Sequence, residues 1–514
     1  MSTNMKSKED ISQQQNKNNC TKISCLLNSS VLYGVSILVL IFSLFYTHSS
    51  HYYNVPDGVK CEKKSYGEYA NKRTYWLYGK NIESGYLHNV ITVLDRFGYK
   101  NDSNSNDWAL LWAHDYPFRV LSHLLHNLKP HQKINHFPGC GYITNKVDLA
   151  TSGLKYIPPA FKLPKDRDKL MKYIDNNPAS SFVEKNNDHR NIFFRNKTDL
   201  KKLNTNNTFV QEFVGNPLLI SGHKFDIGIY TIITSIEPLR IYIYNGDAIL
   251  RFCPVKYYPF DSKNLDKYVV GDDYLPIWRV PSLEYYYNEL DFGMKESLNA
   301  YLKSKGKEPL KIWNQIEDSI RLTILSKEQD ILNVVNRFKF KRNFFEMMRF
   351  DFIVDEDLNV FLLEANMSPN LSSAHFPPNQ LLYQQVLYNM FSLVGVGHRL
   401  YKATQPSRSK AEEQMVVSDR NIAVYPEECS SMLCRESCVS SVCQLCKHCL
   451  SYDTKEYLQE AYREHMDKGD CKRIFPPSMS KLPIPPEVLE NYSPENQLQY
   501  RWFQSKCLLD DSWC

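Results

Sequence analysis

The sequence carries little net charge for its length. Its 62 lysines and arginines nearly balance 57 aspartates and glutamates, which leaves a formal charge of +5 over 514 residues. This balance does not indicate a nucleic-acid-binding protein, and no nucleic-acid partner is predicted. It is compatible with an acidic protein substrate, because local basic surface matters more than the total charge. The chain also lacks an internal repeat.

A composition typical of disorder is absent from most of the chain. Apolar residues make up 43% and charged residues 23%, so a sizeable packed core is expected rather than wholesale disorder. The length suffices for one large domain or about two to three ordinary ones. Residues 1–22 differ, because they are polar and rich in Asn, Gln and Lys. They are predicted to be a disordered tail.

A hydrophobic run follows this tail. Residues 23–46 carry no charge, and Val31–Tyr46 is almost wholly apolar; about 20 such residues span a bilayer. No small-x-small cleavage site is evident, and the run starts far from the N-terminus for a signal peptide. The sequence therefore predicts a transmembrane helix over residues 23–47 and a single-pass membrane protein. A late-starting signal peptide or a buried helix is the alternative. Lysines on both flanks leave the orientation open.

Cysteines are sparse in most of the chain and dense near its C-terminus, where nine of the 14 lie. A tight group there has metal-ligand residue types, but no second well-spaced pair completes a zinc site. Disulfides are favoured over zinc and over free or lipidated thiols. Residues 405–514 are predicted to be a linker and an irregular cysteine-rich tail, because prolines interrupt the last third. The tight group is Cys443, Cys446, His448 and Cys449.

Between the two ends, residues 74–401 are predicted to form one globular domain. Apolar runs at period two alternate with a stretch at helical spacing. This mixture indicates an α+β or α/β enzyme core. The clearest predicted elements are the hairpin Phe225–Ser235 with Leu239–Tyr244, the helical stretch Leu310–Phe338, and the hairpin Phe350–Val354 with Asn359–Glu364.

The second of these hairpins carries a candidate metal site. With Val354 facing Asn359 across the turn, Asp351 shares one face of the hairpin with Glu364 and Asn366. Hard oxygen ligands in this arrangement suit Mg²⁺ that bridges nucleotide phosphates. The alternative is a hairpin whose polar face is simply in contact with water.

The first hairpin adds three charged side chains. Lys224 and Asp226 are two residues apart and share a strand face, where the lysine suits a phosphate and the aspartate suits a metal or a substrate ammonium. Arg251 follows on the next predicted strand and suits bidentate binding of a carboxylate. Ordinary surface ion pairs are the alternative for each residue.

Taken together, these motifs resemble one family. Residues 209–252, with Asn-Pro-Leu-Leu-Ile followed by Lys-Phe-Asp, closely resemble the signature of tubulin–tyrosine-ligase-like proteins. Residues 350–370 resemble it too, as do an Asn-His-Phe-Pro-Gly segment ahead of Lys146 and the proline-rich Tyr156–Pro164. The order and spacing of the motifs agree over residues 74–401.

The resemblance implies an ATP-grasp fold and an ATP-dependent ligase. Such proteins use ATP and Mg²⁺ to convert a carboxylate into an acyl phosphate, which an amino group then attacks; the usual substrate is the acidic tail of tubulin. Metals and fixed cations suit the charge that develops in such a step. By matched position, Lys146 and Lys185 approach the phosphates; Gln211, Phe213 and Val214 hold the adenine; Lys224 and Asp226 lie beside nucleotide or substrate; Arg251 lies beside the substrate carboxylate; and Asp351, Glu364 and Asn366 carry Mg²⁺.

The sequence departs from the family at three places. The loop after Lys185 contains no glycine, although glycine lets a backbone approach a phosphate closely. Gly228 stands where the family has an arginine that contacts the terminal phosphate, so Gly228→Arg is expected to raise a slow activity. The His-Leu-Thr-Asn motif expected after Lys256 is absent.

The family motifs that are present and the three departures from them leave competing functions open. The first is a ligase that attaches glutamate to the tubulin tail, a polyglutamylase. The second is a membrane-tethered pseudoenzyme or binding module with the same fold, and a third is a ligase with a lumenal acceptor. Tubulin as partner requires a catalytic domain on the cytosolic side, near microtubules, which is favoured here. Acceptor sequons at Asn101, Asn196 and Asn206 favour the lumen instead.

Overall fold

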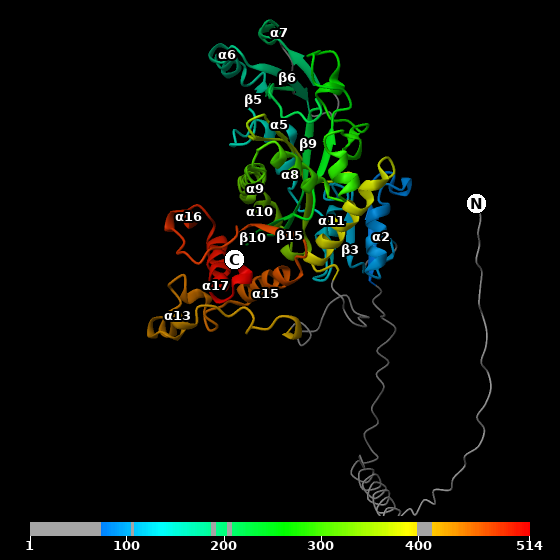
Figure 1. Cartoon of the computed structure of the whole chain (residues 1–514). Coiled ribbons are helices and arrows are strands. Elements are labelled where there is room, and N and C mark those ends of the chain that lie inside the picture. Colours follow the sequence, from blue (N-terminus) through cyan, green and yellow to red (C-terminus); the bar gives the residue numbers. More distant parts are fainter. Residues whose placement is uncertain (1–72, 104–106, 187–191, 203–207, 398–413) are drawn as a thin grey trace, which may run out of the picture. The chain divides into compact units, whose positions relative to one another are not determined.

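The computed structural model describes residues 73–103, 107–186, 192–202, 208–397 and 414–514. Within them the strands form three sheets, with helices packed around them (Figure 1). The disordered tail predicted over residues 1–22 and the helix predicted over residues 23–47 lie outside the described residues.

The first sheet is parallel and is built near the start of the described chain, in the order β2-β1-β3-β4. Helix α2 (His88–Arg96) buries Val90, Val93 and Leu94 on one face, and helix α11 (Gln380–Leu393) packs against it. The strands are β1 (Thr74–Tyr78), β2 (Lys100–Asn101), β3 (Leu110–Ala113) and β4 (Lys133–Ile134), with the short helix α3 (Ser122–Leu125) before β4.

The Asn-His-Phe-Pro-Gly segment joins this first sheet to the centre of the molecule. The side chain of Asn135 accepts a hydrogen bond from the Ala113 amide at 2.7 Å and donates one to the Ala113 carbonyl at 2.9 Å. The next residue, His136, lies with Nδ1 2.7 Å from Glu346 Oε1, and the Phe137 amide donates to Glu346 Oε2 at 2.9 Å. Since Glu346 is fully buried at the start of a central strand, the segment fixes two sheets to each other.

The second sheet is small, antiparallel and ordered β5-β8-β6-β7. It has a core of its own, in which helix α6 contributes Leu170 and Ile174 and strands β6 and β8 contribute Phe182 and Val210. Its strands and helices are β5 (Ala160–Leu163), α6 (Arg167–Asn176), β6 (Ser181–Asn186), β7 (Ile192–Arg195), α7 (Lys197–Lys202) and β8 (Thr208–Phe213).

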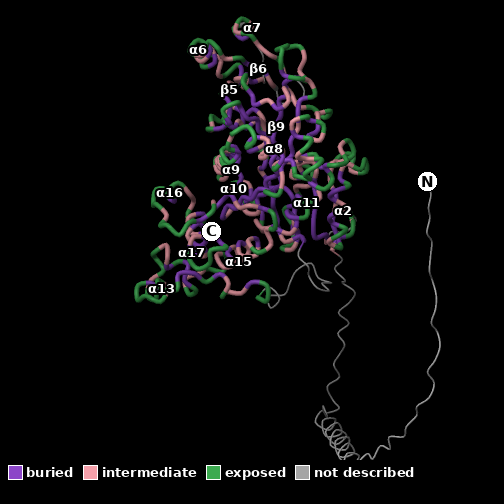
Figure 2. Tube along the Cα trace, viewed as in Figure 1, coloured by how far each residue is buried: buried purple, intermediate pink, exposed green. Residues whose placement is uncertain are grey.

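The third sheet is central, and buried residues follow it closely (Figure 2). Its longest strand, β9 (Phe225–Ile236), pairs along one edge with β13 and along the other with β11 and β10. Every residue of β13 is buried. The remaining strands and flanking helices are β10 (Leu239–Tyr244), β11 (Ile249–Phe252), β12 (Leu275–Pro276), β13 (Glu346–Val354), β14 (Val360–Asn366), α4 (Gly141–Thr144), α5 (Lys146–Ala150), α8 (Met294–Ser304), α9 (Leu310–Leu325) and α10 (Glu328–Val335).

Both predicted hairpins are confirmed, as is the helical stretch, which breaks at Ser326 into α9 and α10. The predicted register of the second hairpin is wrong. Val354 pairs with Val360, and a bulge after Asp351 places that residue directly opposite Glu364. The cause is a longer turn, in which the Asp355 side chain accepts hydrogen bonds from the turn backbone. Asp351 and Glu364 still share one face.

Residues 414–514 fold into a C-terminal lobe rather than the irregular tail predicted. Its core is built around Trp502, Phe503 and Leu458. The preference for disulfides is confirmed: four bridges join Cys429 to Cys446, Cys434 to Cys443, Cys438 to Cys449 and Cys507 to Cys514. The lobe contains α13 (Pro426–Ser430), α14 (Met432–Glu436), α15 (Tyr452–Asp467), β15 (Cys471–Phe475), α16 (Pro486–Glu490) and α17 (Pro494–Leu509).

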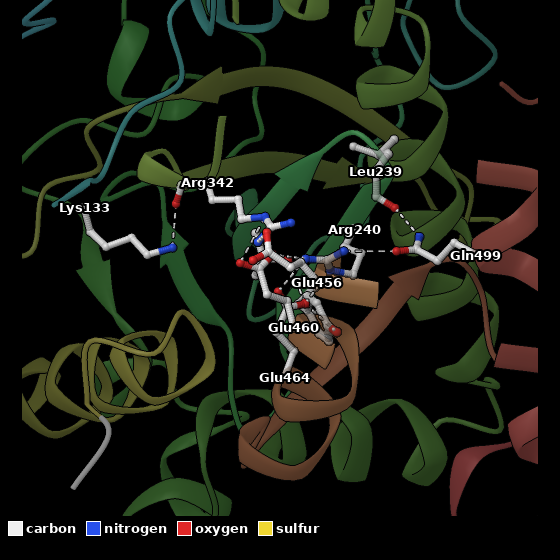
Figure 3. Close-up of polar contacts among 10 residues, drawn as sticks. Lys133, Leu239, Arg240, Arg342, Glu456, Glu460, Glu464 and Gln499 are labelled. Carbon is white, nitrogen blue, oxygen red and sulfur yellow. Dashed lines mark hydrogen bonds and ion pairs between the residues drawn. The ribbon is translucent and has the colours of Figure 1, made fainter. Parts of the chain in front are cut away.

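The C-terminal lobe is part of the central sheet, because its strand β15 pairs antiparallel with β10. Beside this pairing, the fully buried Arg240 of β10 donates to Glu464 of α15, from Nε at 2.8 Å and from Nη2 at 3.0 Å (Figure 3). Gln499 of α17 accepts from Arg240 at 3.1 Å and donates to the Leu239 carbonyl at 2.9 Å. A buried carboxylate and guanidinium persist only when their bonds are satisfied in this way.

The prediction of a membrane-spanning fold is corrected. In the part of the chain that the structure describes, no helix is long and apolar enough to cross a membrane. The longest of these helices, α9, α15 and α17, have 16 residues each, which at about 1.5 Å per residue falls short of a bilayer core of about 30 Å. Among the described residues, no segment supports the predicted single-pass localisation.

Candidate active site

Three neighbouring strands bring the predicted charged residues together. Asp226 on β9 lies directly opposite Arg251 on β11, and Gly228 on β9 lies between Ile249 of β11 and Asp351 of β13. Because alternate residues of a strand point to the same side, Asp226 and Asp351 share one face of the sheet with Arg251. The pairing of these three strands therefore brings the predicted residues together.

The three side chains form one hydrogen-bonded network. Arg251 donates to both oxygens of Asp226, from Nε at 2.9 Å and from Nη2 at 2.8 Å. Its Nη2 also donates to Asp351 Oδ2 at 3.0 Å. A second arginine, Arg349, binds both oxygens of Asp351 at 2.7 and 2.9 Å. Two arginines and two aspartates thus alternate across three strands.

Charge and burial shift the pKa values of the two aspartates in opposite directions. Burial opposes the ionisation of Asp351, but Arg349 and Arg251 outweigh it and hold the pKa of Asp351 below its usual range. For Asp226 burial prevails over Arg251 and raises the pKa to about 6. Asp351 therefore stays an anion under ordinary conditions, whereas Asp226 takes up a proton in mildly acidic solution.

Glu364 and Asn366 extend the network on strand β14. Asn366 Nδ2 lies 3.1 Å from Asp351 Oδ2 and 3.2 Å from Glu364 Oε1. The second oxygen of Glu364 lies 3.0 Å from the Lys146 amine at the start of helix α5. This lysine is close to a carboxylate of the predicted metal set, as a residue that approaches metal-bound phosphates requires.

The donor set fits Mg²⁺. The amide nitrogen of Asn366 now lies between two carboxylate oxygens, where a cation would also be attracted. The nitrogen and oxygen of an amide are distinguished only by their hydrogen bonds. Rotating this amide by half a turn brings a third oxygen toward Asp351 and Glu364, which gives three hard ligands around one point.

The small sheet contributes Lys185 and Gln211, from the adjacent strands β6 and β8. The Lys185 amine donates to Gln211 Oε1 at 2.9 Å, and Gln211 Nε2 donates to the Pro158 carbonyl at 3.2 Å. Burial, together with the charge of Lys224, lowers the pKa of Lys185 to about 8, against the opposing effect of Glu364. The charges of Lys224 and Glu364 therefore act on Lys185, which makes the small sheet part of the site.

Lys224 and Phe213 meet where the small sheet approaches β9. The Lys224 amine donates to the Tyr268 carbonyl at 2.8 Å and lies 5.0 Å from the centre of the Phe213 ring. Burial also lowers the pKa of Lys224. Phe213 packs edge-on against Phe194 and Tyr268. The buried amine and the half-buried ring therefore form one edge of the site.

The structure leaves the predicted ligand contacts of Val214 and Arg251 untested. Val214 is half-buried directly after β8, and its predicted contact with adenine stays a prediction. The predicted binding of a substrate carboxylate by Arg251 also stays a prediction, because this arginine binds Asp226 and Asp351 in the structure.

Comparison with known proteins places this site in a family. A model of the "Tubulin-tyrosine ligase family" matches residues 124–402, more than half of the chain. The chain belongs to the tubulin-tyrosine ligase family. The Caenorhabditis elegans protein "Probable tubulin polyglutamylase ttll-15" is 41% identical over 449 residues, 85% of each chain. Over 60% of this chain, identity is 30% to "Tubulin polyglutamylase TTLL5" of Mus musculus and 29% to "Tubulin monoglutamylase TTLL4" of Homo sapiens, of which the matches cover 24% and 26%.

The sequence prediction missed two residues of this tubulin-tyrosine ligase site. Arg349 precedes Asp351 by two positions on β13, so the alternation that grouped Lys224 with Asp226 also applied to it. Tyr268 gives its backbone carbonyl to Lys224. No side-chain pattern in the sequence indicates a backbone carbonyl contact of this kind, and the stretch around Tyr268 is simply rich in tyrosine and aspartate.

Proposed function

We propose that this chain is an ATP-dependent ligase that attaches glutamate to the acidic tail of tubulin. The observation that carries the proposal is the meeting of cations and carboxylates from separate sheets. Lys146 of α5 contacts Glu364, beside the buried network of Asp351, and the charge of Glu364 acts on Lys185 of the small sheet. The relative named a probable tubulin polyglutamylase, matched over 85% of both chains, supports tubulin as the substrate.

The proposed reaction has two steps. The terminal phosphoryl group of ATP moves to a carboxylate oxygen of the acceptor, which yields ADP and an acyl phosphate. The amino group of the incoming glutamate then attacks the carbonyl carbon, the bond to the phosphate oxygen breaks, and inorganic phosphate leaves. A proton is lost from the amine, and Asp226 would accept it, since its pKa of about 6 keeps it largely ionised at neutral pH.

The chain's own residues serve this chemistry mainly through fixed charge. Asp351, Glu364 and Asn366 would hold Mg²⁺, which neutralises charge on the phosphates. Lys146 and Lys185 are positioned near Glu364 to bind the phosphate oxygens. Gln211, anchored to the Pro158 carbonyl, and Phe213 would line the adenine side. Preorganised charges of this kind lower the barrier because they need no reorientation during the reaction.

A binding module with the same fold is the second candidate, and one observation favours it. Asp351 Oδ2 accepts hydrogen bonds from Arg349, Arg251 and Asn366, one more than the two lone pairs of an oxygen. At least one donor must move before this oxygen takes part in metal binding. A protein that kept the donors in place would bind partners without turnover.

Incorporation of labelled glutamate decides between the two candidates. The full-length chain is incubated with peptides of the tubulin tails, ATP, Mg²⁺ and labelled glutamate. The ligase proposal expects label in the peptide that depends on both ATP and Mg²⁺. A chain that binds ATP in calorimetry but adds no label to any tail peptide or to intact tubulin would establish the binding module instead.

A further inference from the structure

Position 228 has no room for a side chain, because neighbouring side chains already occupy the volume beside its Cα. Its backbone needs no left-handed conformation, but a Cβ atom built on it would lie 2.5 Å from Ile249 Cγ2 and 2.9 Å from Arg349 Cδ. Such distances are too short for carbon atoms in contact. The methylene stem of Arg349 therefore fills the volume that any side chain at position 228 would enter.

The guanidinium of Arg349 is held by two hydrogen bonds to one carboxylate. Its Nε and Nη2 bind the two oxygens of Asp351 at 2.7 and 2.9 Å, and the side chain is only 8% exposed. Asp351 already has a cationic partner in Arg251 at 3.0 Å. A structural ion pair requires one guanidinium, whereas this carboxylate binds two, so the arrangement concentrates positive charge beside the proposed metal ligand.

We propose that Arg349 binds the terminal phosphate of ATP, supplying from strand β13 the cation that is missing at position 228 of strand β9. The inference rests on the proposed function only in taking ATP as the ligand. Asp351 and Glu364 would hold the metal ion that binds the phosphates, so the terminal phosphate would lie near Arg349, which contacts Asp351. The N–H groups of Arg349 would then donate to the phosphate oxygens, whose geometry a guanidinium matches.

The same geometry corrects an expectation from the sequence. Gly228→Arg was expected to restore a missing cation, but the single change drives a side chain into Ile249 and Arg349. On steric grounds we now expect this change to disturb the packing of the sheet rather than to raise activity. In this chain the two positions exclude each other, so only one arginine fits between strands β9 and β13.

The test compares ATP with ADP, because only ATP carries the phosphate in question. Affinities of the full-length chain for both nucleotides with Mg²⁺ are measured by calorimetry for wild type, Arg349→Met and Arg349→Lys. Arg435→Met, on the exposed surface of α14, is the control. We expect the preference for ATP over ADP to fall about tenfold or more in Arg349→Met, since a charge-assisted contact is lost.

Arg349→Lys keeps the charge and most of the stem, so it carries the test if the methionine variant does not fold. We expect a smaller fall in the ATP preference for this variant and none for Arg435→Met. A wild type without ATP preference overturns the proposal, as does a folded Arg349 variant that keeps the wild-type ratio or loses affinity for both nucleotides equally. Glutamate incorporation is not used in this test, so a chain that prefers ATP through Arg349 yet adds no glutamate refutes the proposed function alone.

Discussion

Arg240 on strand β10 and Glu464 on helix α15 form a fully buried ion pair that joins the catalytic sheet to the C-terminal lobe. The family model ends at residue 402, so half of this pair lies outside the matched region. The lobe is therefore a structural part of the enzyme domain, and the pair gives the first prediction.

Glu464→Gln is expected to destabilise the chain by about 3 kcal/mol, because it removes the nearest counter-charge of the buried Arg240 guanidinium and leaves only Glu460, whose oxygen lies 3.4 Å away. The free energy of unfolding is measured by urea denaturation. Glu456→Gln is the matched control: Glu456 also pairs with an arginine, Arg342, but both side chains are about one third exposed. The control should cost less than about 1 kcal/mol. Equal losses in the two variants would contradict the special position of Glu464.

Glu364→Gln is expected to weaken Mg²⁺-dependent binding of ATP about tenfold or more. The change keeps the shape of the side chain but removes one anionic oxygen, and even residues that only support metal ligands affect affinity on this scale. Calorimetry with and without Mg²⁺ measures the effect. Glu356→Gln, in the exposed turn of the same hairpin, should change nothing. Equal affinities in wild type and Glu364→Gln would remove Glu364 from the metal site.

Affinity for ATP is expected to fall as the pH rises from about 7 to 9. The pKa of Lys185 is lowered to about 8, so the free protein loses this charge in that range. An anionic phosphate binds the protonated amine more strongly, and the affinity therefore falls by up to about tenfold per pH unit above the pKa. Lys185→Arg keeps its charge and should flatten the profile. Lys162→Arg, at the exposed position of β5, should keep the wild-type profile. A flat wild-type profile would contradict the role of Lys185.

Gly228→Arg is expected to destabilise the chain by about 1–3 kcal/mol, the usual cost of overpacking a core, and to give no gain in glutamate incorporation. The control is Gly271→Arg, because a Cβ at this exposed glycine meets no atom within 4 Å. Thermal unfolding and incorporation are measured for both variants. A stable Gly228→Arg chain with raised activity would show that the Arg349 side chain moves aside readily, and would contradict this prediction.

Local pattern predicted much of the sheet and of the site. Alternation located β9, β10, β13 and β14, and helical spacing located α9 and α10. Asp351, Glu364 and Asn366 were grouped from alternation, because they lie on one hairpin whose strands are close in sequence. Only the family resemblance joined them to Asp226 and Arg251, and Arg251 precedes Asp351 by 100 residues. The register of the second hairpin was missed, since it depends on hydrogen bonds of the Asp355 side chain within the turn.

Long-range relationships were outside the reach of local pattern. Strand β15 has the sequence Cys-Lys-Arg-Ile-Phe, which contains nothing that selects β10 as its partner. Arg240 appears in the sequence as one arginine in an apolar strand, and its buried partner is more than 200 residues away. The crowding between Gly228 and Arg349 depends on how β13 lies against β9, which only the assembled sheet reveals.

The pairing of β10 with β15 has a consequence for how the protein is made. Tyr244 pairs with Cys471, so about 230 residues must leave the ribosome after β10 before its edge is covered, which takes about 10–45 s at usual rates of synthesis. Throughout that interval the nascent chain presents an open strand edge, and such edges pair readily with other chains. We therefore expect chaperones that shield nascent strands, and slower or faster translation over the second half of the message, to change the yield of this protein. A ribosome that stops before β15 releases a chain prone to aggregation rather than a weaker enzyme.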